Sequence, residues 1–130
     1  MNQTGWADFR TAKREAGALA AQYFVALSMP VPGADPSASR PAHLAYQARL
    51  EREGRILMAG PLSTPDGAHP AGGGLTVYRA ESHAEACALA DADPMHSSGA
   101  RRYEMRAWLV NEGMLRIDVA LTGLSPGGLR

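Results

Sequence analysis

The sequence contains a single cysteine, Cys87, in 130 residues. One cysteine excludes a disulfide within the chain and a zinc site built on several cysteines. No apolar stretch reaches the roughly 20 residues that a membrane-spanning helix needs. Lys13-Arg14 followed by residues 16–27 has a weak likeness to a signal peptide, but Gln22 interrupts it, and we prefer a helix followed by a strand. We therefore expect a protein of the reducing cytoplasm with no membrane partner.

The chain also lacks an excess of charge of either sign. Thirteen Lys and Arg residues balance thirteen Asp and Glu residues, so the formal net charge is zero. Surfaces that bind nucleic acid or anionic membranes usually need a basic excess on one face. The sequence also has no nucleophile elbow, phosphate loop or dinucleotide fingerprint. We expect neither nucleic acid nor a cofactor as a partner.

The stretch from Arg40 to Gly54 predicts a helix that ends just before a strand. Pro41 suits a first helical position, because its φ is already near the helical value. Gly54 suits the position just after a helix, where a left-handed residue closes the last turn. Residues at positions i, i+3, i+4 and i+7 share one face of a helix, and here they are His43, Tyr46, Gln47 and Leu50. His43 is thus expected near the sheet edge, facing inward.

Other segments complete an order of strand, helix, strand, strand, helix, strand. A second helix is expected over Ala84–Asp93, opened by a capping box between Ser82 and Glu85. The Pro- and Gly-rich segment Pro61–Gly74 predicts a turn or flexible lid between two strands. The four strands are expected at Tyr23–Leu27, Ile56–Ala59, Leu75–Arg79 and Tyr103–Val110.

This order is typical of the α+β ferredoxin-like fold, βαββαβ, with both helices on one face of an antiparallel sheet. An N-terminal helix over residues 1–20 and an extra strand at Met114–Leu121 are expected outside it. We expect a domain over residues 21–112, flanked by extensions at 1–20 and 113–130. The uncovered sheet face predicts at least a homodimer.

Asp93 is the most informative carboxylate of the second predicted helix. It continues the inward face of small apolar residues, and Pro94 ends the helix directly after it. An anion in the last turn opposes the helix dipole, so Asp93 needs a cationic partner or serves a site. The alternative is that it accepts hydrogen bonds only from the backbone or from neighbouring serines. His96, two residues after Pro94, is expected to be a solvated loop histidine.

His43 and Asp93 are therefore expected to meet as an acid–base pair, the candidate catalytic residues. A carboxylate on one imidazole nitrogen leaves the other to accept a proton near neutral pH. Two alternatives remain: the pair only joins the two helices, or it forms a metal site with His96. Candidate residues for binding a small-molecule substrate are Arg40, Tyr46, Ser97 and Ser98.

Three motifs also carry a family resemblance: residues 40–44 (RPAHL), 53–62 (EGRILMAGPL) and 90–95 (ADADPM). In these motifs the chain resembles the YciI-like (YCII-domain) proteins, in matching order from Tyr23 to Val110. The resemblance implies a dimeric α-β barrel of ferredoxin-like subunits, similar to muconolactone isomerases. It also implies a His–Asp active site at His43 and Asp93, and one branch resembles dehydrochlorinases of chlorinated hydroxyquinols.

Two functions remain open at this point. The first is a lyase or isomerase that acts on a small, aromatic-derived molecule through His43 and Asp93. The second is a non-catalytic module for ligand binding or dimerisation that keeps the same pocket. A cavity that reaches the imidazole would favour the first function.

Overall fold

The computed structural model describes residues 4–118 and 120–122 of the chain. Its elements follow the predicted order, with one short helix added before the last strand. In chain order they are α1 (Trp6–Glu15), β1 (Ala21–Pro30), α2 (Arg40–Arg52), β2 (Ile56–Ser63), β3 (Pro70–Tyr78), α3 (His83–Asp91), α4 (Pro94–Ser97) and β4 (Arg101–Val110).

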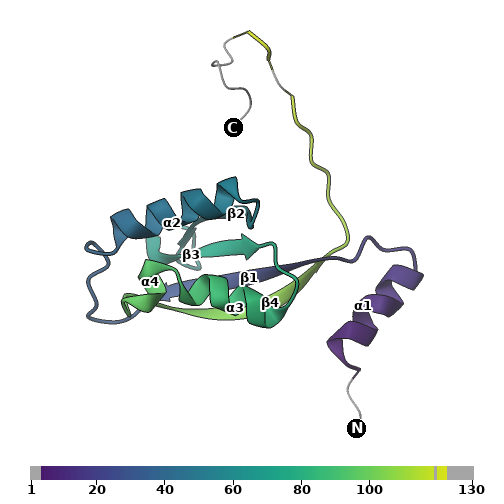
Figure 1. Ribbon diagram of the computed structural model, residues 1–130, viewed down its shortest axis with the longest axis horizontal. Coiled ribbons are helices and arrows are strands. Elements are labelled where there is room, and N and C mark those ends of the chain that lie inside the picture. Colours follow the sequence, from purple (N-terminus) through teal and green to yellow (C-terminus); the bar gives the residue numbers. More distant parts are fainter. Residues whose placement is uncertain (1–3, 119, 123–130) are drawn as a thin grey trace.

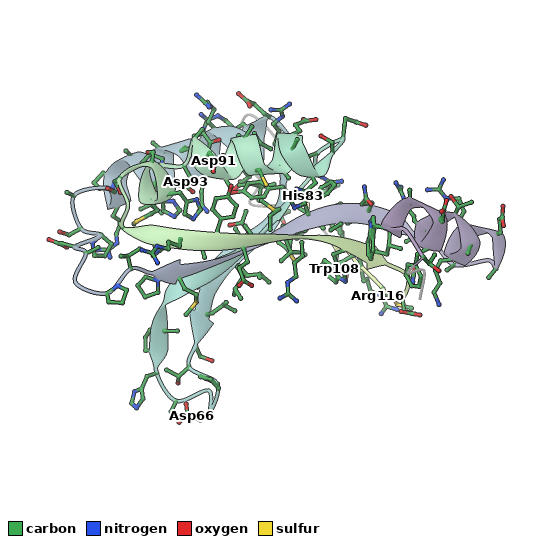
Figure 2. The ribbon with its side chains drawn as sticks, turned by 90° about the horizontal axis from the view of Figure 1, so that it is seen from below. Asp66, His83, Asp91, Asp93, Trp108 and Arg116 are labelled. Atoms are coloured by element: carbon green, nitrogen blue, oxygen red, sulfur yellow. The ribbon has the colours of Figure 1, made fainter. Side chains whose placement is uncertain are left out.

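The four strands form one antiparallel sheet in the order β2-β3-β1-β4. β1 is central and pairs with β4 along its whole length, from Ala21 opposite Val110 to Pro30 opposite Arg101. α2, α3 and α4 cover one face of this sheet (Figures 1 and 2). The predicted α+β ferredoxin-like fold class is therefore confirmed.

The core lies between the helices and the covered face of the sheet. Phe24 and Tyr78 from the strands pack with Leu50 from α2, and all three are buried. Exposure alternates along β4, as period-two geometry requires when only one face is covered. Tyr103 and Met105 pack against the core from that strand.

The ends of α2 lie where the sequence places them. The helix begins at Arg40, and Pro41 occupies its first turn. After the helix Gly54 has a φ of 73°, a left-handed conformation that costs glycine little. The Arg55 amide donates to the Leu50 carbonyl at 2.8 Å, which closes the last turn. The chain then enters β2 at Ile56, and this fixes the register between α2 and the sheet.

The connection between β2 and β3 differs from the prediction. Strand pairing continues to Ser63 opposite Pro70, so only residues 64–69 form the turn, and the predicted lid over Pro61–Gly74 is wrong in extent. Pro61 is tolerated because β2 is an edge strand. The tip of this hairpin, marked by Asp66, projects on the side opposite the helices (Figure 2).

The N-terminal helix α1 is present, but it has no buried residue. It begins after Gly5 and ends at Glu15, within the predicted range 1–20. Two side-chain hydrogen bonds join it to the following segment: Trp6 Nε1 donates to Gln22 Oε1 at 2.7 Å, and Arg10 Nε donates to the Ala20 carbonyl at 3.2 Å. The helix lies beyond the end of the sheet (Figure 1).

The predicted fifth strand over Met114–Leu121 is wrong for the residues that can be described. Residues 114–118, 120 and 121 adopt no strand, and residue 119 lies outside the described part. The large apolar side chains of this segment are exposed, so it gains no strand partner or core. The Gly- and Pro-rich end, 123–130, also lies outside the described residues.

None of the described helices has the length and apolarity to cross a bilayer.

Candidate functional site

Asp93 lies between two helices rather than in the last turn of one. α3 ends at Asp91, and Asp93 has an extended backbone (φ −67°, ψ 126°), the conformation that the following Pro94 favours. Its Oδ1 accepts a hydrogen bond from the Met95 amide at 2.9 Å and so caps α4. The prediction of an anion at a helix C-terminus is therefore wrong. Asp93 is at a helix N-terminus, where a carboxylate is favoured.

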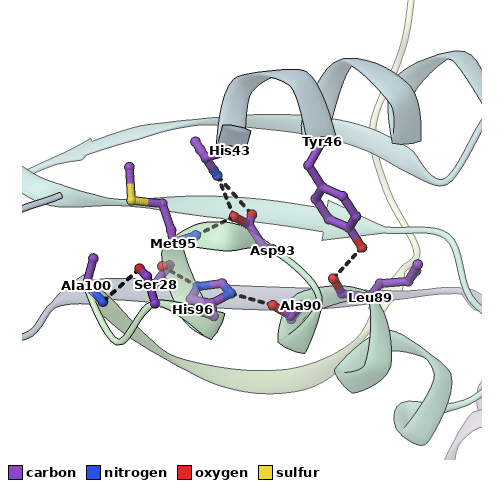
Figure 3. Close-up of polar contacts among 10 residues, drawn as sticks. Ser28, His43, Tyr46, Leu89, Ala90, Asp93, Met95, His96 and Ala100 are labelled. Carbon is purple, nitrogen blue, oxygen red and sulfur yellow. Dashed lines mark hydrogen bonds and ion pairs between the residues drawn. The ribbon is translucent and has the colours of Figure 1, made fainter. Parts of the chain in front are cut away.

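His43 reaches Asp93 from the first turn of α2, as the sequence predicts. Its Nδ1 lies 2.7 Å from Oδ1 and 2.9 Å from Oδ2 of the carboxylate (Figure 3). Both side chains are largely removed from water, with 12% of His43 and 2% of Asp93 exposed. Because an ionised carboxylate only accepts, Nδ1 carries the proton. In the neutral ring Nε2, which has no hydrogen-bond partner among the described residues, then has the lone pair.

A cavity of about 300 Å³ lies beside this pair. It is bounded by α2 and α4 and by residues from all four strands of the sheet. Arg40, His43 and Asp93 line it, so it contains three of the residues singled out from the sequence. The remaining wall consists of Ser28, Leu44, Gln47, Gly60, Pro61, Gly73, Gly74, Leu75, Thr76, Met95, His96 and Arg101.

His96 is part of this wall, and the prediction that it is a solvated loop residue is wrong. Its Nδ1 lies 2.7 Å from the Ala90 carbonyl, and its Nε2 lies 2.7 Å from Ser28 Oγ (Figure 3). Since a carbonyl only accepts, Nδ1 donates to Ala90, and in the neutral ring Ser28 donates to Nε2. Two sequence signals point to this pair. Ser28 interrupts the buried side of β1, and Asp93-Pro94 is a helix start that carries His96 back toward the sheet.

Arg101, like Ser28, is a cavity residue that the sequence analysis does not identify. It is half-buried at the start of β4 and lines the cavity. The alternation of β4 could have found it, because Arg101 shares a face with Tyr103 and Met105, which pack against the core. Its Nε is buried and donates to no atom of the described residues.

The other sequence candidates lie outside the cavity lining. The Tyr46 hydroxyl donates to the Leu89 carbonyl at 2.7 Å, and burial raises the pKa of Tyr46. Ser97 and Ser98 are exposed. Ser98 Oγ accepts from the Ala100 amide at 3.3 Å, while Ser97 lines a separate shallow hollow beside Arg101.

The metal alternative gains no support from this geometry. Nδ1 of His43 is bonded to Asp93, and both ring nitrogens of His96 have protein partners. Across residues 4–118 and 120–122, no group of three or more His, Cys, Asp or Glu side chains is placed to hold a metal ion. The arrangement is suited to proton transfer at His43 Nε2, in a cavity that also presents a serine, a second histidine and two arginines.

Known proteins resemble this chain in sequence and in fold. Protein YciI from Escherichia coli O6:H1 and from Shigella flexneri are each 44% identical over 64 residues, which is 46% of this chain. The match spans 65% of the length of these relatives.

One solved structure shares the fold, with a TM-score of 0.54 and 24% identity over 66% of this chain and 92% of the other. It is 5-chloro-2-hydroxyhydroquinone dehydrochlorinase (TftG) from Burkholderia phenoliruptrix AC1100, in complex with 2,5-dihydroxybenzoquinone.

The sequence pattern of one family covers most of the folded unit described above. The pattern of the YCII-related domain matches residues 23–109, which include the whole of α2, β2, β3, α3 and α4. His43 and Asp93 both lie within the match. The chain belongs to the YCII-related domain family, as its sequence motifs predict.

Proposed function

We propose that this protein is a small lyase or isomerase in which His43 transfers a proton and Asp93 holds its imidazole. One observation carries the proposal: Asp93 binds Nδ1 of His43 through both oxygens, at 2.7 and 2.9 Å, beside a cavity of about 300 Å³. A histidine held in this way is oriented for general acid–base work. The dehydrochlorinase with the same fold holds a small ring compound, and this supports a ligand of that size.

The proposed chemistry begins when Nε2 of His43 accepts a proton from an acidic C–H or O–H group of the substrate. The ring then becomes an imidazolium, and the Asp93 carboxylate stabilises its positive charge through the Nδ1 hydrogen bond. The electron pair left on the substrate has two fates. In an isomerisation it takes the proton back from the imidazolium at another atom. In an elimination it forms a new double bond while the leaving group departs with its bonding electrons, and the imidazolium then gives its proton to the leaving group or to water.

Asp93 is built to keep its orientation during such a step. Besides His43, it accepts the Met95 amide at 2.9 Å, so the carboxylate is fixed from two sides. α2 carries the base and α4 carries the amide, and the carboxylate connects them. A preorganised acceptor of this kind stabilises charge without having to move during the reaction.

A non-catalytic ligand-binding module remains the second candidate. The observation that favours it is the same connection, because the His43–Asp93 pair joins α2 to α4 and caps a helix whether or not a proton moves. Under this alternative the cavity binds a small molecule and leaves it chemically unchanged.

Deuterium incorporation separates the two functions. Small aromatic and lactone acids are first screened for thermal stabilisation of the protein, and the ligands found are incubated with it in D2O and followed by NMR. We expect exchange at one acidic position of a bound ligand, lost in His43→Gln and retained in His69→Gln, whose site lies in the exposed hairpin turn. Binding without exchange, or exchange that survives His43→Gln, would falsify the catalytic proposal.

The assembly that we propose is a homodimer in which the uncovered face of the sheet is buried. Large apolar side chains are exposed on that face, among them Leu27, Met29, Met58 and Trp108. An exposed apolar patch of this kind is typical of an interaction surface, and a second copy of the chain can cover it.

A further inference from the structure

The charges around the cavity are unequal, although the chain as a whole has no net charge. Its lining contains two arginines, Arg40 and Arg101, and a single carboxylate, Asp93. The Asp93 carboxylate already accepts hydrogen bonds from His43 and from the Met95 amide. Neither arginine forms an ion pair with any residue that the structure describes. With both histidines neutral, the lining therefore carries one positive charge in excess.

Arg101 is the less hydrated of the two arginines. Arg40 is exposed at the start of α2, whereas Arg101 is half-buried. The Arg101 Nε is fully removed from solvent and donates to nothing within the described part of the chain. Buried polar groups in proteins are nearly always hydrogen-bonded, because an unmade bond costs free energy. Arg101 nevertheless lines the cavity and has no ion-pair partner among the described residues, and an unpaired guanidinium is suited to bind a carboxylate or phenolate oxygen.

The backbone around Arg101 keeps it in place. Arg101 is the first residue of β4 and pairs with Pro30 of β1. The preceding residue, Ala100, accepts the Val31 amide at 3.0 Å, so the start of the strand is tied to the end of β1. Ser28, two residues before Pro30, lines the same cavity. The position of Arg101 is thus set by the sheet and does not depend on a mobile loop.

We propose that Arg101 makes this cavity selective for small monoanions, by binding a carboxylate or phenolate oxygen of the ligand. The inference rests on the proposed function only in assigning the ligand to the same site as His43. One negative charge balances the excess of the lining. A cavity of about 300 Å³ lies at the small end of ligand sites, which suits a single-ring acid.

Benzoate and benzamide test this selectivity, because they share a ring and a shape and differ in charge. Calorimetry with the full chain at low salt should show benzoate binding about tenfold or more tightly than benzamide. Arg101→Gln should remove that preference by weakening benzoate alone, and Arg101→Lys should keep part of it. Arg106→Gln is the matched control, since Arg106 is in the same strand and is exposed on the other face. It should change neither affinity.

Three results would overturn the inference: equal affinity of the wild type for the two probes, no benzoate binding at roughly 10 mM, or an undiminished preference in Arg101→Gln. If Arg101→Gln fails to fold, as judged by circular dichroism, Arg101→Lys decides through its reduced preference. His43→Gln should retain the preference for benzoate while losing deuterium exchange. Failure of the catalytic proposal and failure of the anion site are therefore seen in different measurements.

Discussion

The two faces of the sheet are built from the same strands but differ in what covers them. On the covered face Phe24 and Tyr78 are buried beneath the helices. On the other face Trp108 is 45% exposed, and Figure 2 shows it on the side of the sheet opposite Asp93. The strands supply both faces by simple alternation. The candidate site lies where helix ends meet the covered face, and the open face is the surface that we propose for assembly.

Among the predicted changes, replacing Asp93 on the covered face should lower the free energy of unfolding most. Asp93→Ala removes the cap of α4 and leaves the largely buried Nδ1 of His43 without its acceptor. Loss of a helix cap and of a buried charged partner should together lower the free energy of unfolding by about 3 kcal/mol. Urea denaturation measures this change. Glu51→Ala is the control, because Glu51 is exposed on α2 and its side chain has no hydrogen bond or ion pair among the described residues, so it should cost less than about 1 kcal/mol. Equal losses in the two variants would contradict the assigned role.

The features of the covered face that the sequence predicts correctly are those set by neighbouring residues in the chain. Pro41 and Gly54 mark the ends of α2 through backbone preferences alone, and both ends lie where predicted. The contact between His43 and Asp93 was also predictable, since the sequence pattern places each on an inward helical face, although Asp93 in the structure lies between α3 and α4. The environment of Asp93 was not, because four residues are too few to give α4 a periodic pattern. By its local effect Pro94 indicates only the end of one helix, although in the structure it also begins the next.

The parts that the sequence did not reveal depend on distant contacts. His96 is held by the Ala90 carbonyl and by Ser28, which lies 68 residues away in the chain. The length of the hairpin depends on the pairing between β2 and β3, which continues past Pro61 opposite Gly74 to Ser63 opposite Pro70. Local composition there favours a loop, and the neighbouring strand overrides it. Met114–Leu121 is the reverse case, in which an apolar pattern meets no partner strand in the described sheet.

The second prediction concerns the cavity wall where the hairpin leaves the sheet. A Cβ added at Gly74 would lie 2.8 Å from the Gly60 carbonyl oxygen, so Gly74→Ala should force β2 and β3 apart. Overpacking of this kind should cost about 2 kcal/mol and weaken ligand binding in the cavity. Gly60→Ala is the matched control, because its Cβ would meet nothing within 4 Å. Thermal unfolding of both variants measures the difference, and a Gly74→Ala protein as stable as Gly60→Ala would contradict the predicted clash.

The last prediction tests the open face, where the effect is on assembly and not on the fold. If a second copy covers this face, Trp108→Glu places a charge in the interface and should raise the dimer dissociation constant at least about tenfold. Trp6→Glu is a demanding control, because Trp6 is 44% exposed, almost as much as Trp108, but belongs to α1. Light scattering at micromolar concentration should report a dimer for the wild type and for Trp6→Glu, and monomers for Trp108→Glu. The melting of the monomeric fold should change little, since Trp108 packs in no part of the core. A monomeric wild type would refute the proposed assembly, and a Trp108→Glu dimer would move the interface to another surface.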